Sequence, residues 1–512
     1  MSSNAFSSTE IDEPKRSRII SADTAILLAI AAGFALLHLL TNNRYGFHRD
    51  ELQFLSDARH LDWGFVPYPP FTPFVEHIAM AIFGLNMVGL RLFSVIAQAT
   101  VILVSGLMAR DLGGNRLAQV ATAMSVSLSA VPLFEATEFQ YTSFSYLWWI
   151  LACWFTILLL KSENPRWLIA VGACIGLGLL SKYSVAFFVA GLVAGLALTS
   201  ARRYFASRWF WLGAALALLI FLPNLIWLDR HDWISYHFLQ HIHMRDIGEG
   251  RAQGYWRLQF LYDINLFAIP LWVTGFIACL RSSRYRLLAW MYAVPVLFFW
   301  IAKGRFYYVA EAYPAIIAMG AAVAGHWLNS RATWLRRSLA TAFFVGLFAF
   351  GALYAAVELP FASSGALRQF ALARNGDLRE EIGWNDLVRT VAQIRDSLPP
   401  DQQAHLGITT GNYGEYGAID VLGRSYGLPE PIGTNNSEWL RGYPASPPTT
   451  LIVLGLTREQ ADSIFTDCRW AAHNGNSEGV QNEESQFHPD IFVCGPPRQP
   501  WPELWKKHKD FG

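Results

Sequence analysis

Long apolar runs alternate with short polar loops through the first two thirds of the chain. A helix that crosses a membrane needs about 20 mainly apolar residues. Runs of roughly that length predict eleven spanning helices, at 23–41, 87–109, 117–134, 143–160, 167–181, 184–200, 209–228, 262–280, 286–302, 308–328 and 338–357. The stretch 71–85 is also apolar, but Pro73, Glu76 and His77 within it predict an interfacial segment instead.

The pattern changes after residue 357. The short apolar stretches AHLGITT, TTLIVLGL and DIFVCGP are typical of buried strands, whereas GWNDLVRTVAQIRDSL and TREQADSIF are typical of helices that open on a polar residue. Alternation of strands and helices predicts a small α/β domain with parallel strands. We therefore divide the chain into a tail at 1–22, a transmembrane domain at 23–357 that includes a first loop at 42–86, and an α/β domain at 358–512.

Composition agrees with a polytopic α-helical membrane protein. Of the 512 residues, 53% are hydrophobic and 15% are charged, whereas soluble domains have roughly 25% charged residues. The net charge of +1 creates no field that would attract nucleic acid, so we expect membrane lipid and no nucleic acid among the partners.

Basic residues in the short loops predict the orientation. The loops GGNR, KSENPR, SARRYFASR, RSSRYR and NSRATWLRR fall on the same side as Lys15, Arg16 and Arg18 of the N-terminal tail. Basic short loops face the cytoplasm, so the tail is predicted to be cytoplasmic and 23–41 a retained membrane helix. An odd number of spans then places 358–512 outside, where Cys468 and Cys494 can form a disulfide.

Polar chemistry is concentrated on the predicted outer side. Acids near a membrane are costly unless they are functional or solvated. The predicted outer loops combine acids, bases and tyrosines, whereas the predicted cytoplasmic loops do not. The candidate site residues in the outer loops are Asp50, Glu51, Glu135, Glu138, Lys182, Tyr183, Lys303, Arg305, Tyr307 and Tyr308.

The first loop has a helical pattern of its own. Apolar residues recur at near-helical spacing, at Leu52, Leu55, Ala58 and Leu61. This spacing predicts an amphipathic helix lying on the membrane surface. Asp50 and Glu51 would stand at its N-terminus, where the helix dipole favours negative charge. A capping Asp with a solvated Glu and a chemically active pair are both consistent with this pattern.

Several blocks of the chain resemble a known family. YGFHRDEL with ARHLDWGFVPYPPFTP is similar to the first extracytoplasmic loop of bacterial GT-C glycosyltransferases of the protein O-mannosyltransferase and aminoarabinose-transferase superfamily (glycosyltransferase family thirty-nine). The resemblance continues in four further blocks, which are SKYS at 181–184, KGRFYYVAEAYPAIIAMGA at 303–321, NYGEYGAIDVLG at 412–423 and LPEPIGTNNSEWLRGY at 428–443. It thus spans nearly the whole chain.

The resemblance implies a GT-C fold of about eleven transmembrane helices and an activity. Such enzymes transfer a monosaccharide from a polyprenyl phosphate to an acceptor outside the cytoplasmic membrane, here lipid A or lipopolysaccharide, another envelope glycan or a protein. The first-loop acid, carried over as Asp50 with Glu51 beside it, would take the acceptor proton, and one displacement would invert the anomeric carbon. The resemblance also implies cations and hydroxyls for the donor phosphate, and we expect these to come from Lys182, Tyr183, Lys303, Arg305, Tyr307 and Tyr308.

A divalent metal ion is left open. Some relatives use a second-loop acid together with a metal, and Glu138, with Glu135 three residues before it, stands at the corresponding place. Carboxylates without a nearby His favour a hard cation over zinc. His237, His241 and His243 lie in a long polar loop without an HExxH arrangement, so an acceptor-facing or solvated surface is expected there.

Two alternatives compete with a periplasmic-facing transferase in a bacterial inner membrane. One is a transporter or flippase for lipid-linked sugars, although such proteins tend to show repeated halves and broken midplane helices, which this sequence lacks. The other is a non-catalytic envelope-assembly protein with a degenerate site. Replacing Asp50 discriminates between these hypotheses. A transferase should lose turnover while still folding, and neither alternative predicts this result.

Overall fold

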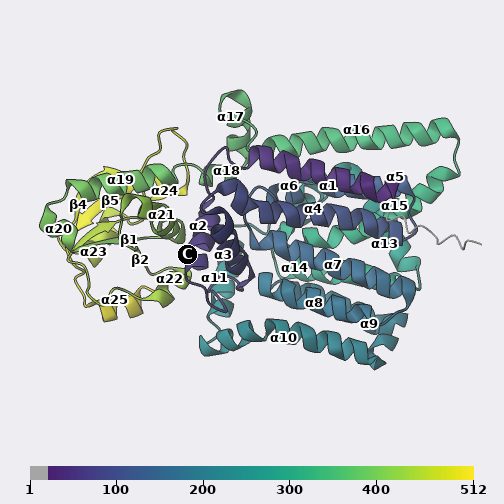
Figure 1. Cartoon of the computed structure of the whole chain (residues 1–512), viewed down its shortest axis with the longest axis horizontal. Helices are drawn as coiled ribbons and strands as arrows, with labels where there is room; N and C mark the ends of the chain where they lie inside the picture. Colours follow the sequence, from purple (N-terminus) through teal and green to yellow (C-terminus); the bar gives the residue numbers. More distant parts are fainter. Residues whose placement is uncertain (1–20, 512) are drawn as a thin grey trace, which may run out of the picture.

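The computed structural model describes residues 21–511, which form a bundle of long helices and a smaller α/β domain (Figure 1). The N-terminal residues Lys15, Arg16 and Arg18, and most of the predicted tail at 1–22, lie outside the described residues. The bundle consists of α1 (Ala22–Thr41), α4 (Met87–Asp111), α5 (Arg116–Ser127), α6 (Ala130–Glu135), α7 (Tyr141–Ser162), α8 (Trp167–Ser181), α9 (Val185–Leu198), α10 (Arg208–Arg230), α13 (Ile269–Arg281), α14 (Arg286–Ile301), α15 (Tyr313–Asn329) and α16 (Thr333–Glu358).

Each predicted span coincides with a helix, but the helices differ in length. Among residues 21–511, six helices are long and apolar enough to cross a membrane, and two bent pairs raise this to eight. The predicted span 117–134 is broken between α5 and α6, where the Asn265 side-chain amide donates to the carbonyl oxygen of Leu128 at 2.8 Å. Because α8 and α14 are also shorter than a full span, the count of eleven stays a prediction.

Glycine pairs bring neighbouring helices of the bundle into backbone contact. A Cβ atom at Gly275 of α13 would lie 1.9 Å from the carbonyl oxygen of Ile316 in α15, and one at Gly320 of α15 would lie 1.7 Å from that of Leu271. Small residues allow such close approach in membranes, where van der Waals packing holds helices together. Only glycine fits at these two crossings.

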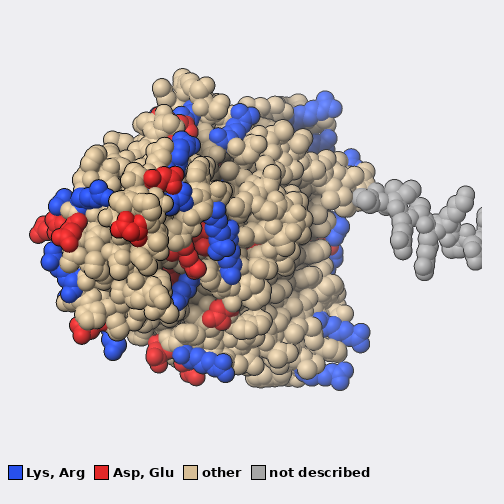
Figure 2. All heavy atoms as spheres, turned by 60° about the vertical axis from the view of Figure 1, so that its left-hand side comes forward, with Lys and Arg blue, Asp and Glu red and all other residues tan. Residues whose placement is uncertain are grey.

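Charge divides the surface into three zones along the long axis. In Figure 2 charged residues of both signs gather over the α/β domain and its border with the bundle, and the part of the helices beyond that border is nearly bare of charge on the face shown. Lys and Arg reappear at the opposite end of the bundle. This distribution is typical of a protein with a lipid-facing belt and one basic face.

The α/β domain contains a five-stranded sheet in the order β2-β1-β3-β5-β4. Its strands are β1 (Leu406–Thr410), β2 (Ile432–Gly433), β3 (Thr450–Val453), β4 (Arg469–His473) and β5 (Asp490–Cys494). The prediction of an all-parallel sheet is wrong, because β5 runs antiparallel to both β3 and β4. The strand β4, with sequence RWAAH, was not predicted, since none of its side chains is buried and it does not form an apolar run.

Helices cover this sheet and connect it to the bundle. They are α17 (Gly365–Arg374), α18 (Asp377–Glu380), α19 (Trp384–Ser397), α20 (Pro400–Ala404), α21 (Tyr413–Leu422), α22 (Asn436–Arg441), α23 (Arg458–Ile464), α24 (Glu483–Phe487) and α25 (Trp501–Lys507). The helices predicted at 383–398 and 457–465 correspond to α19 and α23. A disulfide joins Cys468 to Cys494 and so fastens the start of β4 to the end of β5.

The first loop forms two helices between the bundle and the domain, α2 (Arg49–Arg59) and α3 (Phe71–Phe83) (Figure 1). The helix expected in this loop is present, but its placement on the membrane surface is wrong. Residues 51–58 are all buried, and Leu52 and Leu55 share a hydrophobic cluster with Trp384, Val388 and other residues of the α/β domain. The domain therefore covers the face of α2 that was expected to meet lipid or solvent.

Smaller elements join the main helices. Those of the bundle are η1 (Ser200–Ala206), α11 (Ile234–Gly248), α12 (Tyr255–Leu258), the π-helical turn η2 (Gln259–Asp263), η3 (Leu266–Ala268) and η4 (Phe306–Ala312), and η5 (Gly423–Tyr426) follows α21 in the α/β domain. Of these, η2 and η4 supply walls of the cavity described next.

Candidate active site

A capping box forms the N-terminus of α2, and its two acids, Asp50 and Glu51, have different roles in it. The backbone N–H of Asp50 donates to Nδ1 of His48 at 3.2 Å, and the backbone N–H of His48 donates to the Glu51 carboxylate at 2.8 Å. Glu51 is thus the capping acid of the helix. Asp50 takes no part in this cap through its side chain.

The Glu51 carboxylate is fully engaged in a buried ion pair. The guanidinium of Arg91 in α4 donates to both of its oxygens, at 2.9 and 2.6 Å, and the backbone N–H of Phe139 adds a bond of 2.8 Å. The same guanidinium reaches the carbonyl oxygens of Asn42 and Gly46. These contacts tie α2, α4 and the second outer loop together.

The Asp50 carboxylate faces a cavity at the end of the bundle nearest the α/β domain. Its Oδ1 accepts a hydrogen bond from the Tyr413 hydroxyl at 2.9 Å, and its Oδ2 lies 3.4 Å from the Gln140 side-chain nitrogen. The cavity has a volume of about 420 Å³. Its polar lining comes from the first loop, from α6 to α7, from η2 and η4, and from the end of α16 and the segment that follows it. The polar lining residues are His48, Asp50, Glu135, Gln140, Tyr141, Thr142, Tyr262, Arg305, Tyr307, Glu358, Arg374, Asn375 and Asp377.

Two of the predicted donor-binding residues, Arg305 and Tyr307, line this cavity. The Arg305 guanidinium donates to both oxygens of Asp246 in α11, at 2.7 and 2.6 Å, and to the Tyr307 hydroxyl at 2.8 Å. This holds the cation in one orientation. Arg374, which sequence reasoning missed, also lines the cavity, and its guanidinium lies 3.9 Å from the centre of the Phe370 ring.

The other predicted donor-binding residues lie elsewhere. The Lys182 ammonium packs over the rings of Tyr308 and Tyr141, at 4.8 and 5.4 Å from their centroids, and does not line the cavity. Tyr183 packs against a hydrophobic cluster that includes Trp227. Lys303 lines a separate hollow between α12 and the end of α14.

The second-loop acids also differ in position. Glu135 lines the cavity and accepts hydrogen bonds from the hydroxyls of Thr142 and Ser143. Glu138 is buried, accepts a bond of 2.9 Å from Gln140, and lies outside the cavity lining. Burial raises the pKa of the Glu138 carboxyl well above its usual range.

No group of three or more His, Cys, Asp or Glu side chains within residues 21–511 is arranged to hold a metal ion. Glu135 accepts from the hydroxyls of Thr142 and Ser143. Glu138 accepts from Gln140 through one oxygen, which also lies 3.6 Å from Nδ1 of His48, while its other oxygen has no hydrogen-bond partner. We therefore derive no step through a metal, and the sequence-based expectation of one stays a prediction.

Tyr413 and Gln140 are the two residues at Asp50 that the sequence did not single out. Gln140 is two residues after Glu138, so the attention given to that acid could have included it. Tyr413 is 363 residues from Asp50. Its only signal was the block NYGEYGAIDVLG, whose place in space the chain alone does not reveal.

Comparison with known proteins identifies sequence relatives with named activities. Residues 67–227 match the family described as dolichyl-phosphate-mannose-protein mannosyltransferase. A lipid A galacturonosyltransferase of Rhizobium johnstonii is 28% identical over 60% of this chain and 65% of its own length. An undecaprenyl phosphate-alpha-4-amino-4-deoxy-L-arabinose arabinosyl transferase of Pseudomonas fluorescens is 27% identical over 50% of this chain and 47% of its own. The chain thus matches less than two thirds of the length of either relative.

Solved structures share the fold over a much longer stretch. ArnT from Cupriavidus metallidurans in the apo state superposes with a TM-score of 0.55 at 14% identity, covering 93% of this chain and 98% of that one. The archaeal oligosaccharyltransferase AglB from Archaeoglobus fulgidus superposes with a TM-score of 0.53 at 13% identity, covering 93% and 76%. The architecture of a helical bundle with an added outer domain is therefore shared with these proteins.

Proposed function

We propose that this chain is a member of the GT-C glycosyltransferase superfamily of the aminoarabinose transferases and protein O-mannosyltransferases, as its similarity to such proteins supports. In this proposal it transfers a monosaccharide from a polyprenyl phosphate to an acceptor hydroxyl. The observation that carries the proposal is the cavity in which the Asp50 carboxylate and the Arg305 guanidinium stand together. A base and a cation within one cavity are what a displacement at a sugar phosphate requires.

The reaction follows from these two groups. The acceptor oxygen attacks the anomeric carbon and passes its proton to Asp50. The bond between that carbon and the phosphate oxygen breaks, and the lipid phosphate leaves with the electron pair. Arg305, with Arg374 at the wall and the Tyr307 hydroxyl beside it, stabilises the negative charge that develops. A single displacement inverts the anomeric configuration.

The acceptor we propose is lipid A or the lipopolysaccharide core. Two relatives support this choice, since they are named a lipid A and a lipopolysaccharide core galacturonosyltransferase. The site would then be on the outer face of a bacterial inner membrane, where the nearly uncharged belt of the bundle fits the bilayer (Figure 2). A flippase gains no support, because the polar groups meet at one end of the bundle and not along a path through it.

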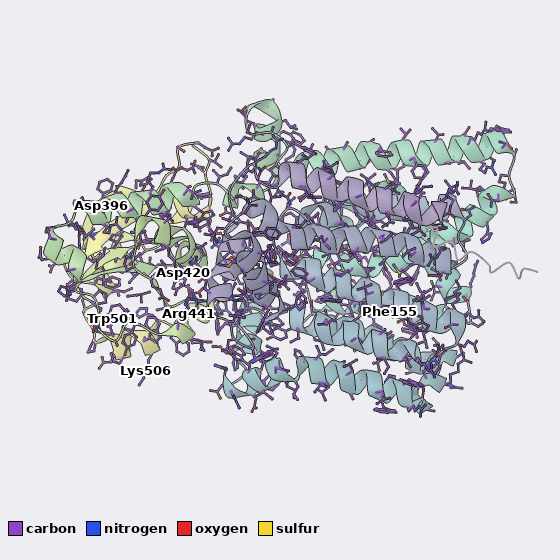
Figure 3. The ribbon with its side chains drawn as sticks, in the orientation of Figure 1. Phe155, Asp396, Asp420, Arg441, Trp501 and Lys506 are labelled. Carbon is purple, nitrogen blue, oxygen red and sulfur yellow. A yellow bond between two sulfur atoms is a disulfide. The ribbon has the colours of Figure 1, made fainter. Side chains whose placement is uncertain are left out.

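The experiment compares the full-length protein with its Asp50→Asn variant, both reconstituted in nanodiscs. Each is supplied with a panel of undecaprenyl-phosphate monosaccharides and lipid A, and products are identified by mass spectrometry. Wild type adds one sugar from one member of the panel, and Asp50→Asn loses at least about 100-fold in turnover. Asp396→Asn, which changes an acid at the far side of the α/β domain (Figure 3), serves as control and keeps full turnover. Full activity of Asp50→Asn would refute the mechanism.

A further inference from the structure

The α/β domain presses α21 directly against α2. A Cβ atom at Gly417 of α21 would lie 2.5 Å from the carbonyl oxygen of Leu52, so a glycine is needed for the two backbones to meet. A Cβ atom at Gly414, one turn earlier on the same helix, would lie 3.2 Å from the Cβ of Arg49. This contact brings the N-terminus of α21 alongside the N-terminus of α2.

At that meeting point Tyr413, the first residue of α21, reaches Asp50. Its hydroxyl donates to Oδ1 at 2.9 Å. The Arg49 guanidinium lies 4.7 Å from the centre of the Tyr413 ring, and Arg49 is itself paired with Glu483 and, at 3.8 Å, with Glu484 of α24. The phenol is therefore held on one side by a cation that the α/β domain anchors.

A second set of contacts fixes the other end of α2. The Arg441 guanidinium pairs with Asp57 and donates to the Ser56 hydroxyl at 2.8 Å. Arg59 donates to the carbonyl oxygen of Asp420 at 2.5 Å. Figure 3 shows Asp420 and Arg441 on the side of the α/β domain that faces the bundle. Because both ends of α2 are bound to the domain, the helix cannot move independently of it.

We infer that Tyr413 is a positioning residue for Asp50, so that the α/β domain completes the active site of the bundle. The inference rests on the proposed function, because it assumes that Asp50 accepts the acceptor proton. The phenolic O–H occupies one carboxylate oxygen and leaves the other directed at the cavity.

The test compares Tyr413→Phe with wild type in the full-length protein, using the donor of the panel that gives the highest turnover and lipid A as acceptor. Tyr426→Phe, which removes the same oxygen from an exposed ring in η5, is the matched control. We expect kcat to fall about 10-fold or more, as for loss of a hydrogen bond to a charged group, while KM for the donor stays unchanged. Tyr426→Phe changes none of these.

A second variant covers the case in which Tyr413→Phe does not fold. Glu483→Gln weakens the anchor of Arg49 at a carboxylate whose side chain is 51% exposed, so the fold tolerates it. We expect a smaller loss of kcat, again with KM for the donor unchanged. An unchanged kcat in a folded Tyr413→Phe, or in Glu483→Gln where the former is unfolded, overturns the inference.

The two proposals fail in different ways. If Asp50→Asn abolishes transfer while Tyr413→Phe behaves as wild type at every pH, only the positioning role is wrong. If Asp50→Asn itself retains full transfer, the proposed function is wrong and the Tyr413 experiment loses its premise.

Discussion

Two neighbouring carboxylates at the start of α2 have opposite surroundings. Asp50 is directed at a cavity, whereas Glu51 is held by Arg91 and two backbone N–H groups. A buried charge that loses its partner is strongly destabilising. The structure therefore indicates that Glu51 and Arg91 hold α2 in place. A substitution in this pair should change the stability of the protein and not the proton transfer at Asp50.

At the residue scale we predict that Arg91→Ala destabilises the protein by about 3–5 kcal/mol, since it leaves the Glu51 carboxylate buried without a cation. Arg91→Lys keeps the charge but loses the two-pronged contact, so its effect is smaller. Thermal unfolding of the detergent-solubilised protein measures both. Arg44→Ala, which removes an exposed arginine in the same loop, is the control. An unfolding midpoint for Arg91→Ala equal to that of wild type would contradict this account.

Asp50 was predictable from sequence, and its partner was not. An acid that follows an apolar run and opens an amphipathic helix has a local signal, and the family resemblance adds to it. Tyr413 contacts Asp50 only because α21 packs on α2 across hundreds of residues of chain. Of the two neighbouring basic residues after α14, Arg305 lines the cavity, whereas Lys303, which has a left-handed backbone with φ of 54°, lines a separate hollow.

At the scale of elements, α21 contains a buried acid whose titration affects the docked helix. Glu415 is buried, and this burial, with the nearby charge of Glu484, raises the pKa of its carboxyl from 4.5 to about 8. The folded state therefore holds a proton that the unfolded state releases. This stabilisation is complete below about pH 4.5 and is lost as the pH rises through 8.

We predict that the thermal stability of the wild type falls between pH 6 and about 8, and that Glu415→Gln reduces this fall because an amide needs no proton. The variant is consequently more stable than wild type at the upper end of the range. Glu459→Gln, at an exposed position of α23, should leave the pH dependence as it is. An identical slope in wild type and Glu415→Gln would rule out Glu415 as its source.

Most helices of the bundle were predictable because an apolar run encodes each of them. The break between α5 and α6 within one apolar run was not predicted, and at this break Asn265, from a distant part of the chain, donates to Leu128. In the α/β domain the buried strands β1, β3 and β5 were visible as apolar stretches. Strand direction was not visible, because pairing of β5 with β3 and β4 is a property of the assembled sheet.

At the scale of the whole molecule, the proposed reaction requires the cavity and the α/β domain to lie outside the cytoplasm. The disulfide between Cys468 and Cys494 agrees with this, because such bonds persist in oxidising compartments. The remaining cysteines, Cys153, Cys174 and Cys279, are buried. An engineered surface cysteine is therefore the site that a water-soluble maleimide reaches.

We predict that Lys506→Cys, on α25 of the α/β domain (Figure 3), is labelled by a membrane-impermeant maleimide in cells whose outer membrane alone has been opened. Arg331→Cys, between α15 and α16 at the opposite end of the bundle, should be labelled only after the inner membrane is broken. The basic loops at that end favour the cytoplasm, and α25 belongs to the domain that binds α2. Labelling of Arg331→Cys but not Lys506→Cys in intact spheroplasts would place the cavity in the cytoplasm, where neither the disulfide nor the proposed acceptor fits.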